Sequence, residues 1–449
     1  MRRLLVVAYF FPPVGGVGVE RTLKHVEHLP THGWQPVVVA PANSGYRLVD
    51  PATEARIPPG TEVHRVRTVE PAHLRRAVGR LVGRGGSRPT APATTASPEA
   101  GTGGLLGRVR DAANAAWGAT IPLLFFPDEQ VAWLPGAVAA GVAAHQAEPV
   151  DAIYSSSPPV SGHLAAGRIA RRIGRPWIAD FRDPWIGNAF ARRLPAPHRA
   201  AQRRMERWIV EQADRVVLAT AAIRDAFATR YPDREGRLVH LPNGYDLADL
   251  GGEPAAPRDD GTFRLIYAGS VYGDRELGIL LDGVELLLTR RPELRERLRI
   301  EFVGWMSEAN LSLAARRLPA LDPVVRHTGF VRRAEAIARQ RGADAGLVLI
   351  AAGEGRDAVA TGKLYEYLGL DLPVLAVVPP GEVRRILGEL DWGVVADPTP
   401  RGVADGLARI MELPRPDRPA DPERRYERAA LTARLVELLD EVTAAQRKP

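Results

Sequence analysis

The sequence alternates short apolar segments with amphipathic segments of helical periodicity, and it does so in two successive series. Alternating strands and helices imply parallel strands with helices on both faces of the sheet. We therefore predict an α/β protein of two tandem, doubly wound, Rossmann-like domains that face each other across a cleft. The predicted strands are Leu4–Ala8, Pro36–Ala40, Val63–Val66, Ala152–Ser155, Trp177–Asp180, Val216–Ala219, Leu238–Leu241, Phe263–Ala268, Arg299–Val303, Val325–Gly329, Ala345–Ile350, Pro373–Val377 and Gly393–Val395.

A polar segment rich in Pro and Gly, LADLGGEPAAPRDDG, separates the two series. Such composition is typical of a linker between domains. We predict an N-terminal domain over residues 1–246, a linker over 247–261 and a second domain over 262–413. Residues 414–449 are predicted as a further linker and a C-terminal helix that packs toward the N-terminal domain. Residues 84–104 are mainly Gly, Pro, Ser, Thr and Ala, which predicts a disordered insertion.

The composition excludes several classes of site. The chain has no cysteine, so disulfides, thiolate metal sites and a cysteine nucleophile are excluded. Its 10 histidines show no metal-ligand spacing such as HExxH, and we expect no cofactor and no protein-bound metal. No apolar run is long enough to predict a membrane-spanning helix. The N-terminal MRRLLVVAYFF is interpreted as a buried strand rather than a signal peptide. A cytoplasmic location is expected, with peripheral contact to the inner face of the membrane left open.

The basic residues are almost all arginines. Of 60 basic residues only Lys24, Lys363 and Lys448 are lysines, and the net charge is +7. A codon bias toward arginine accounts for this excess, with a phosphate-bearing substrate or an anionic membrane as the alternative. Basic residues alternate with acids, as on solvated helix faces, and are not interleaved with aromatics. We therefore expect no nucleic-acid partner.

Two segments of the first series carry residues suited to ligand binding. FPPVGGVGVER follows the first strand, and Gly15 and Gly16 would let a ligand approach the backbone at a helix start. Arg21 stands where a dinucleotide fingerprint would have its third glycine, so the alternative is a tight strand–helix connection. ADFRDPW places Arg182 and Asp183 directly after a strand, and the alternative is a structural ion pair.

The second series has two corresponding segments. YAGSVYGDR follows its first strand, and there a glycine turn with Ser270 could hold a phosphate that Arg275 clamps. TGKLYEYLG contains Lys363, whose compact ammonium at a helix start suits a phosphate. Glu366 lies three residues further on the same helix face, so an ordinary ion pair with Lys363 is the alternative.

In this order, and over nearly the whole chain except residues 84–104, these segments resemble the glycosyltransferase family 4 group of enzymes with the GT-B fold. The segments that carry the resemblance are FPPVGGVGVER, ADFRDPW, LPNGYD, YAGSVYGDR, HTGFV and TGKLYEYLGLDLPVLA. The resemblance implies a retaining, metal-independent transfer of a sugar from a nucleotide diphosphate sugar to an acceptor, with the N-terminal domain on the acceptor side.

The resemblance also implies roles for individual residues. Arg275 and Lys363 would neutralise the departing diphosphate, and Glu366 would accept hydrogen bonds from the ribose hydroxyls. Phe330 and Val331 would border the base, and Ser270 would lie in the phosphate loop. Gly15 and Gly16 would let the N-terminal loop approach donor and acceptor.

The sequence departs from the family pattern in two places. The commoner pattern has two glutamates with seven residues between them, and counting back from Glu366 gives Ala358. The nearest acids are Glu354 and Asp357, and we take Glu354 as the candidate that faces the donor sugar. Many relatives have His-Asp where this chain has Arg182 and Asp183, so no catalytic histidine is carried over. Asp183, as an acceptor-orienting residue or base, completes the catalytic candidates.

The predicted function is therefore that of a hexosyltransferase-type glycosyltransferase acting on a glycan, a lipid-linked sugar or a natural product. Two alternatives remain: a nucleotide-sugar epimerase of the same fold, and a degenerate binding module without activity. The apolar segment Ala116–Pro135 predicts either core packing or a surface for a lipid or hydrophobic acceptor.

Overall fold

The computed structural model describes most of the chain. The described residues are 1–46, 48–81, 120–121, 124–188, 194–251, 260–271, 274–414 and 416–446. Within them, the side chains of Val17, residues 77–81, Asp274 and Arg275 are not described. The predicted insertion over 84–104 lies outside the described residues.

The chain divides into two compact units. The first unit comprises Met1–Ala219, Ile223–Leu241 and Thr432–Pro449, and the second comprises Thr220–Ala222 and Pro242–Leu431. Each unit is built around its own parallel sheet.

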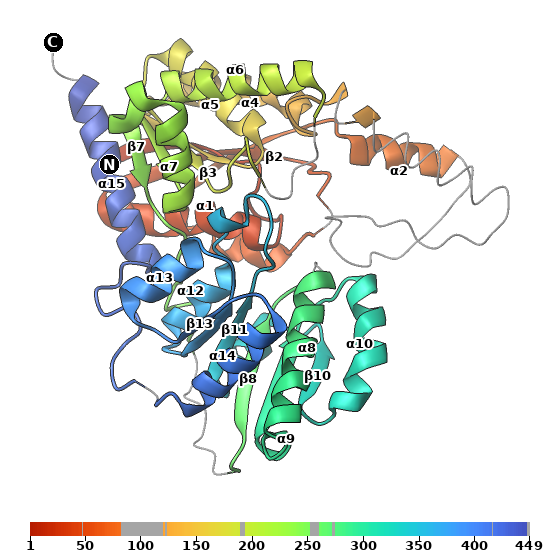
Figure 1. The fold of residues 1–449 in the computed structure, drawn as a ribbon. Coiled ribbons are helices and arrows are strands. Elements are labelled where there is room, and N and C mark those ends of the chain that lie inside the picture. The colour runs from red at the N-terminus through yellow and green to blue at the C-terminus, as the bar shows by residue number, and fades with distance from the viewer. Residues whose placement is uncertain are drawn as a thin grey trace. The chain divides into compact units, whose positions relative to one another are not determined.

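The sheet of the first unit has seven strands in the order β3-β2-β1-β4-β5-β6-β7, all paired in parallel. Figure 1 labels β2, β3 and β7 of this sheet. The strand order reverses between β1 and β4, which are neighbours in the sheet, so this is its topological switch point. The strands are β1 (Arg2–Val7), β2 (Trp34–Pro41), β3 (Glu62–Val66), β4 (Ala152–Ser157), β5 (Trp177–Phe181), β6 (Arg215–Leu218) and β7 (Leu238–His240).

Helices cover both faces of this sheet, because its strands carry apolar side chains on both. Trp177 and Asp180 of β5 point to opposite faces: Trp177 lies beside His163 of α5, whereas Asp180 bonds Arg21 of α1. The helices are α1 (Val17–His28), α2 (Pro71–Leu81), α4 (Leu134–Ala147), α5 (Val160–Ile173), α6 (Ala196–Gln212), α7 (Ala221–Arg230) and the C-terminal α15 (Arg428–Gln446).

From Thr432 onward, α15 belongs to the first unit. The Thr432 hydroxyl lies 2.9 Å from Nδ1 of the buried His25 on α1. Asp440 accepts a hydrogen bond from the Trp34 indole at 3.1 Å and pairs with Arg2 at 2.8 Å. Side-chain contacts about two turns apart thus fix the helix to α1 and to the first two strands.

A buried polar cluster joins α1 to the sheet. The Arg21 guanidinium donates to both carboxylate oxygens of Asp180, at 2.7 and 3.0 Å, and to the carbonyl of Leu241 at 2.9 Å. The Tyr154 hydroxyl also donates to Asp180. Burial alone would raise the pKa of Asp180, but Arg21 and these hydrogen bonds hold it below its usual value. The arginine that interrupts the glycine pattern is therefore an internal anchor of the helix.

The sheet of the second unit has six strands in the order β10-β9-β8-β11-β12-β13, again all parallel. Its switch point lies between β8 and β11. The strands are β8 (Phe263–Ala268), β9 (Leu298–Val303), β10 (Val325–Gly329), β11 (Ala345–Leu349), β12 (Val374–Val377) and β13 (Val394–Ala396).

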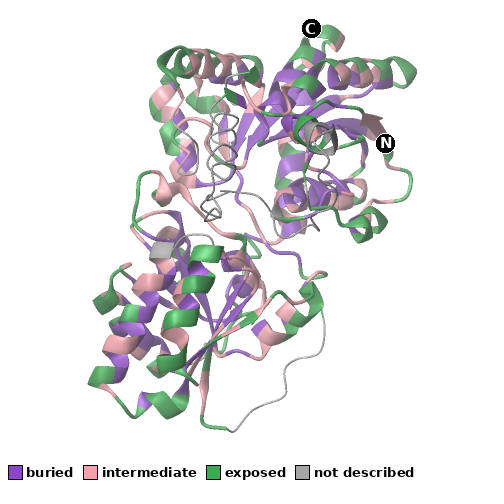
Figure 2. Cartoon of the chain, turned by 90° about the vertical axis from the view of Figure 1, so that its right-hand side faces the viewer, coloured by how far each residue is buried: buried purple, intermediate pink, exposed green. Residues whose placement is uncertain are grey.

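Two apolar cores lie on the two faces of this second sheet (Figure 2). Leu265 belongs to one core and its neighbour Ile266 to the other, as the period-2 alternation of a strand requires. The covering helices are α8 (Asp274–Arg290), α9 (Leu294–Arg297), α10 (Glu308–Leu321), α11 (Arg333–Arg341), α12 (Gly362–Gly369), α13 (Glu382–Leu390) and α14 (Pro400–Glu412), with a 3-10 turn η5 (Arg356–Ala358).

At the switch point of the second sheet, a tyrosine hydroxyl replaces backbone hydrogen bonds between β8 and β11. β8 and β11 are in register only at Leu265 with Ala345 and Ile266 with Gly346. The buried Tyr367 hydroxyl donates to the Ile266 carbonyl at 3.0 Å and accepts from the Ala268 amide at 3.1 Å. A Cβ at Gly346 would lie 2.4 Å from the Tyr367 ring. The glycine therefore makes room for the ring, and the ring supplies hydrogen bonds where the strands diverge.

The segment LPNGYD lies in the second unit from Pro242 onward. Tyr245 pairs with the segment before α15: its amide donates to the Tyr426 carbonyl at 2.9 Å, and its carbonyl accepts from the Arg428 amide at 2.8 Å. A Cβ at Gly244 would lie 2.0 Å from the Tyr426 carbonyl oxygen, so this close approach requires glycine.

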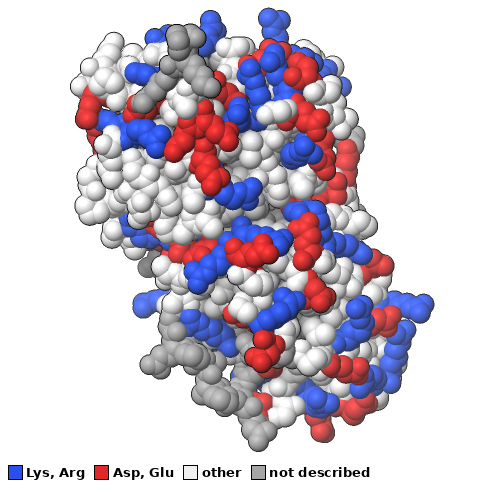
Figure 3. Space-filling model, turned by 90° about the vertical axis from the view of Figure 1, so that its left-hand side faces the viewer, with Lys and Arg blue, Asp and Glu red and all other residues white. Residues whose placement is uncertain are grey.

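These findings confirm the predicted fold class of two parallel α/β sheets. Each predicted strand overlaps an observed one, with ends that differ by at most two residues. No described helix is both long and apolar enough to cross a membrane. On the face shown in Figure 3, basic and acidic side chains are interspersed, as the sequence predicts for solvated helix faces.

We expect Asp180→Asn to lower the free energy of unfolding of the first unit by about 3–5 kcal/mol, because it leaves the Arg21 charge buried without its counter-ion. Chemical denaturation measures this.

The matched control is Glu441→Gln, which removes the exposed pair with Arg215 and should cost about 0–1 kcal/mol. Since the pKa of Asp180 is lowered, its contribution is complete above the ordinary aspartate value. The difference from wild type should persist down to about pH 4 and shrink only below it. Equal effects of the two variants would contradict this account of the cluster.

We expect Tyr367→Phe to destabilise the second unit by about 1–3 kcal/mol, since the Ile266 carbonyl and the Ala268 amide lose a buried partner while the ring remains. Urea denaturation of the variant, followed by circular dichroism, gives the value. An unchanged unfolding midpoint would show that the hydroxyl does not support the diverging strands.

Candidate functional site

In each unit, polar and glycine residues gather where the strand order reverses, at the carboxyl ends of the central strands. Ligands of open α/β sheets bind at this position, because the neighbouring loops run in opposite directions and leave space between them. We describe each unit separately.

The first unit has a hollow at the carboxyl ends of β1 and β4. It is a shallow, open depression lined by Ala8, Tyr9, Phe10, Gly18, Thr22, Ser156, Pro158 and Arg182.

The predicted glycine turn forms one rim of this region. Gly16 precedes α1 with a φ of 93°, a conformation that favours glycine. The Gly15 amide donates to the Leu48 carbonyl at 2.9 Å, and a Cβ on Gly15 would lie 3.0 Å from the Asp50 Cβ. The space that side chains would need at both glycines is therefore taken by the loop that contains Leu48 and Asp50.

Arg182 lies in the wall of the hollow. Its guanidinium donates to the Gly18 carbonyl and lies 5.9 Å from the centre of the Phe10 ring. Its backbone amide donates to the Ser157 carbonyl at 3.1 Å. Burial lowers the pKa of Arg182, with the nearby Asp183 acting in the opposite direction, and an arginine keeps its charge under such conditions. Arg182 therefore supplies a fixed positive charge beside β5.

Asp183 is exposed, one residue further along the same loop. Asp180 is fully buried in the cluster with Arg21 and Tyr154. The two carboxylates of ADFRDPW thus have separate environments: the first anchors α1, and the second is open to solvent.

A second polar cluster holds Tyr9 in the wall of the hollow. The Tyr9 hydroxyl donates to Glu70 at 2.5 Å and lies 2.9 Å from the Ser44 hydroxyl. Glu70 also accepts from the Gly45 amide at 3.0 Å, and its burial raises its pKa. Tyr9, Phe10 and Thr22 were not predicted as site residues. Their position within or beside the first glycine turn was the available signal for them.

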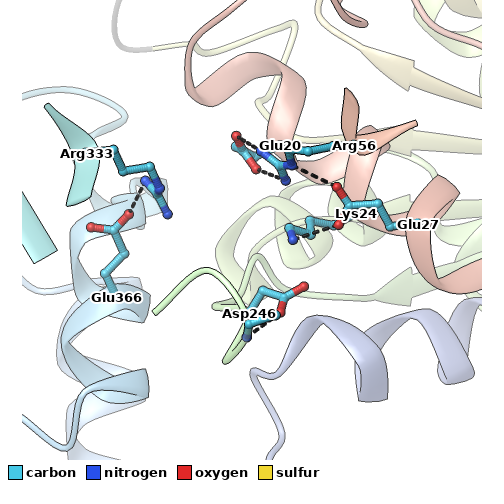
Figure 4. A network of polar contacts seen from close by, with 8 residues as sticks. Glu20, Lys24, Glu27, Arg56, Asp246, Arg333 and Glu366 are labelled. Carbon is cyan, nitrogen blue, oxygen red and sulfur yellow. Dashed lines mark hydrogen bonds and ion pairs between the residues drawn. The ribbon is translucent and has the colours of Figure 1, made fainter. Parts of the chain in front are cut away.

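A further polar network lies along the outer face of α1 (Figure 4). Arg56 donates to Glu20 at 3.0 Å and to Glu27 at 2.9 Å, and Lys24 pairs with Glu27 at 2.7 Å. Glu20, Lys24 and Glu27 lie on α1, and Arg56 reaches them from the end of the 3-10 helix η2 (Pro51–Arg56), so two acids and two bases compensate one another.

In the second unit, Lys363 stands over the end of β8. Its Nζ lies 4.6 Å from the centre of the Tyr267 ring. A Cβ on Gly269 would lie 2.6 Å from the Lys363 Cε, and the φ of Gly269 is 130°, so a side chain here would be strained and would displace the end of the lysine. Lys363 is in the first turn of α12, where the helix dipole already favours an anion. The sequence predicted a lysine at the start of a helix. Its position beside Tyr267 and Gly269 is set by the tertiary structure.

Glycines with positive φ lie at the carboxyl ends of β8, β9 and β10. Gly269, Gly304 and Gly329 have φ values of 130°, 136° and 83°. A Cβ on Gly304 would lie 2.5 Å from the Gly269 carbonyl oxygen, and the Gly304 amide donates to the Gly329 carbonyl at 2.8 Å. The edge beside Lys363 is therefore largely bare backbone, over which a ligand could lie closely.

Glu366 is oriented by residues of α11. Its Oε1 accepts from Arg333 at 3.0 Å (Figure 4), and its Oε2 accepts from Gln340 at 3.4 Å. The sequence left open an ordinary ion pair between Lys363 and Glu366. In the structure, the ion pair of Glu366 is with Arg333. A carboxylate has about four lone-pair sites, so Glu366 retains capacity for further donors.

The other predicted donor-side residues have different environments. Phe330 is 85% exposed directly after β10, whereas Val331 packs against the core. The Ser270 carbonyl accepts from the Tyr267 hydroxyl at 3.0 Å. The side chain of Arg275 lies outside the described residues. Glu354 is exposed on the loop after β11.

Two charged residues near Lys363 were not predicted from the sequence. Glu276, in the first turn of α8, accepts from Arg356 at 3.2 Å and from the Ala351 amide at 3.4 Å. Glu276 lies next to the predicted Arg275, and Arg356 lies in the same loop as Glu354. Only the meeting of α8 with the end of β11 brings these two side chains together with Lys363.

Comparison with known proteins agrees with this architecture. Residues 100–249 match the family model described as Glycosyltransferase Family 4. A D-inositol 3-phosphate glycosyltransferase of Nocardiopsis dassonvillei is 30% identical over 147 residues, which are 31% of this chain and 34% of the relative. Its counterpart in Kineococcus radiotolerans is 28% identical over 272 residues, which are 56% of this chain and 59% of the relative. The chain thus spans 34% to 59% of the length of these curated relatives.

Solved structures share the fold over nearly the whole chain. A sucrose-phosphate synthase from Thermosynechococcus elongatus has a TM-score of 0.62 and 14% identity, with 99% of this chain and 100% of that chain covered. The Anabaena protein HepE in complex with UDP has a TM-score of 0.60 and 14% identity, with 98% and 100% covered. Residues 100–249 are thus similar to glycosyltransferase family 4, and the solved structures share the fold of nearly the whole chain.

Proposed function

We propose that the protein is a retaining glycosyltransferase that moves a sugar from a nucleoside diphosphate sugar to an acceptor hydroxyl without a protein-bound metal. The observation that carries this proposal is the position of Lys363 at the switch point of the second sheet, over Gly269 and the Tyr267 ring. A nucleoside diphosphate departs readily only if its growing negative charge is neutralised. A fixed cation and a helix N-terminus perform this task in advance of the reaction.

The donor would lie along the bare backbone edge of the second unit. Lys363 and Arg275 neutralise the diphosphate, and Ser270 lies in the same loop. Glu366, held by Arg333, accepts hydrogen bonds from the ribose hydroxyls. Phe330 supports this arrangement, since a large aromatic ring left 85% exposed offers a stacking face for the base.

The acceptor would be oriented by the first unit. Arg182 offers a fixed charge in the wall of the hollow, and the exposed Asp183 is placed to orient the acceptor hydroxyl or accept its proton. Gly15 and Gly16 let the N-terminal loop approach the reacting groups. Glu354 is the acid that we assign to the donor sugar.

The comparisons guide the choice of substrates for testing. HepE of Anabaena has been solved with UDP and with UDP-glucose, and the curated relatives are named for D-inositol 3-phosphate. We propose UDP-glucose as the first donor to test. A panel of phosphorylated polyols, lipid-linked sugars and small natural products, read by mass spectrometry, identifies the acceptor.

The same experiments separate the two alternatives. An epimerase would convert UDP-glucose to its epimer with no acceptor present. A degenerate module would neither transfer the sugar nor hydrolyse the donor slowly. Transfer that depends on the acceptor supports the proposed activity against both.

Peripheral membrane contact stays a separate proposal, supported by Leu124, which is 71% exposed in the predicted apolar segment. The nearby Trp133 is buried against Tyr9, which makes that part of the segment core. Unchanged sedimentation of Leu124→Ser with anionic liposomes would contradict the membrane proposal alone.

We expect Lys363→Ala to lower the rate of transfer by about two to three decades, which corresponds to the loss of about 2–4 kcal/mol of transition-state stabilisation. It should also weaken UDP binding in isothermal titration. The matched control is Arg290→Ala, which removes an exposed cation paired with Asp405 in the same unit and should leave both values unchanged. Undisturbed UDP binding in Lys363→Ala would refute the proposed donor site.

We expect Phe330→Ala to weaken UDP binding by about 1–3 kcal/mol, the usual value of a base stacked on an aromatic ring. Thermal stability should not change, because the ring is mostly exposed. Leu311→Ala, an exposed apolar side chain on α10, is the control. Equal affinity for UDP and for inorganic pyrophosphate in the wild type would show that the base makes no such contact.

A further inference from the structure

Three charged side chains meet at the switch point of the second sheet, and only one of them is explained by a bound diphosphate in the proposal above. Glu276 comes from the first turn of α8, Arg356 from η5 after β11, and Lys363 from the first turn of α12. The acid is the unexpected member, because a carboxylate beside a diphosphate site repels the ligand.

Glu276 is tied to both the loop and the cations. Its side chain is 12% exposed and its Oε1 accepts from Arg356 at 3.2 Å. The same oxygen accepts from the Ala351 amide at 3.4 Å, directly after β11. One carboxylate thus connects α8 to both ends of the segment from Ala351 to Arg356.

The charge of Glu276 is balanced by its surroundings. Burial raises its pKa, while the Ala351 amide, Arg356 and then Lys363 act in the opposite direction. From β8, the group that faces Lys363 is the Tyr267 ring, which carries no charge. On α8, Asp274 and Arg275 precede Glu276, and their side chains are not described. Among the described side chains, Glu276 is therefore an acid that offsets the charges of Arg356 and Lys363.

We propose that Glu276 is an internal counter-ion that holds Arg356 and its loop in the absence of donor. When the donor binds, Arg356 moves from Glu276 to the diphosphate, and Glu276 takes up a proton. This rests on the proposed function, since it assigns Arg356 as a further diphosphate ligand. The diphosphate carries more charge than one carboxylate and so competes for the guanidinium, for which its oxygens are well matched. The carboxylate, now beside an anion instead of a cation, favours its protonated form.

The test is isothermal titration of the full-length protein with UDP and with inorganic pyrophosphate, in buffers of different ionisation enthalpy. We expect net proton uptake on binding at about pH 6 and little at about pH 8, since the carboxylate gains its proton only near its own range. Glu276→Gln should lower that uptake, and the difference from the wild type is the share of the carboxylate, because the phosphate groups of the ligand also titrate in this range. It should also raise the affinity for pyrophosphate at about pH 8 by roughly three- to tenfold, the size of an interaction worth up to one pKa unit.

Matched controls separate this role from a merely structural one. Glu285→Gln removes another acid of α8 that pairs with an arginine, Arg317, and should change neither proton uptake nor affinity. Arg356→Ala should weaken pyrophosphate binding at least tenfold, whereas Arg317→Ala should not. A structural Glu276 would lower thermal stability in Glu276→Gln without altering the proton count.

Each outcome decides between the proposals. If the wild type binds UDP and Glu276→Gln shows the same proton uptake, or binds more weakly as Lys363→Ala does, the counter-ion role is wrong and the proposed function stands. If pyrophosphate binds with this uptake but UDP binds no better, the counter-ion role stands and the nucleotide-sugar function is wrong. If neither ligand binds, both proposals are wrong.

Discussion

Parallel strand pairing is the constraint on which the rest of this structure depends. Because the strands of each sheet run in one direction, their carboxyl ends share one edge, and the helices that follow begin there. Loops, helix N-termini and glycine turns are therefore concentrated at this edge in both units. The hollow beside β1 and β4 and the Lys363 region beside β8 and β11 are two instances of the same geometry.

Buried polar anchors keep that edge in shape. In the first unit, Arg21 fixes α1 to Asp180 on β5, and in the second, the Tyr367 hydroxyl supplies hydrogen bonds to the backbone of β8. Both side chains satisfy polar groups that would otherwise be costly to bury. Side chains at this edge, such as Arg182 and Lys363, are thereby held in fixed positions. The proposed stabilisation of the charge on a departing diphosphate requires such fixed positions.

The second unit combines features that favour an anion with one that opposes it. Bare backbone at Gly269 and Gly304, the start of α12 and the cations Lys363 and Arg356 all favour negative charge. Glu276 offsets part of that field. Such a cluster is less costly to hold with its own counter-ion, because the partly buried cations are not left uncompensated.

The sequence by itself determined the strands, their parallel arrangement and the resemblance to a family, because these follow from apolar periodicity and from motifs a few residues long. It also predicted that Lys363 and Glu366 share a helix face, which is local geometry. Only the tertiary structure decided the partners of these side chains: Glu366 pairs with Arg333, Asp180 with Arg21 rather than Arg182, and Glu276 with Arg356. These partners are 33, 159 and 80 residues apart. A charge pattern along the chain cannot reveal such pairs, since the packing of helices on the sheet brings them together.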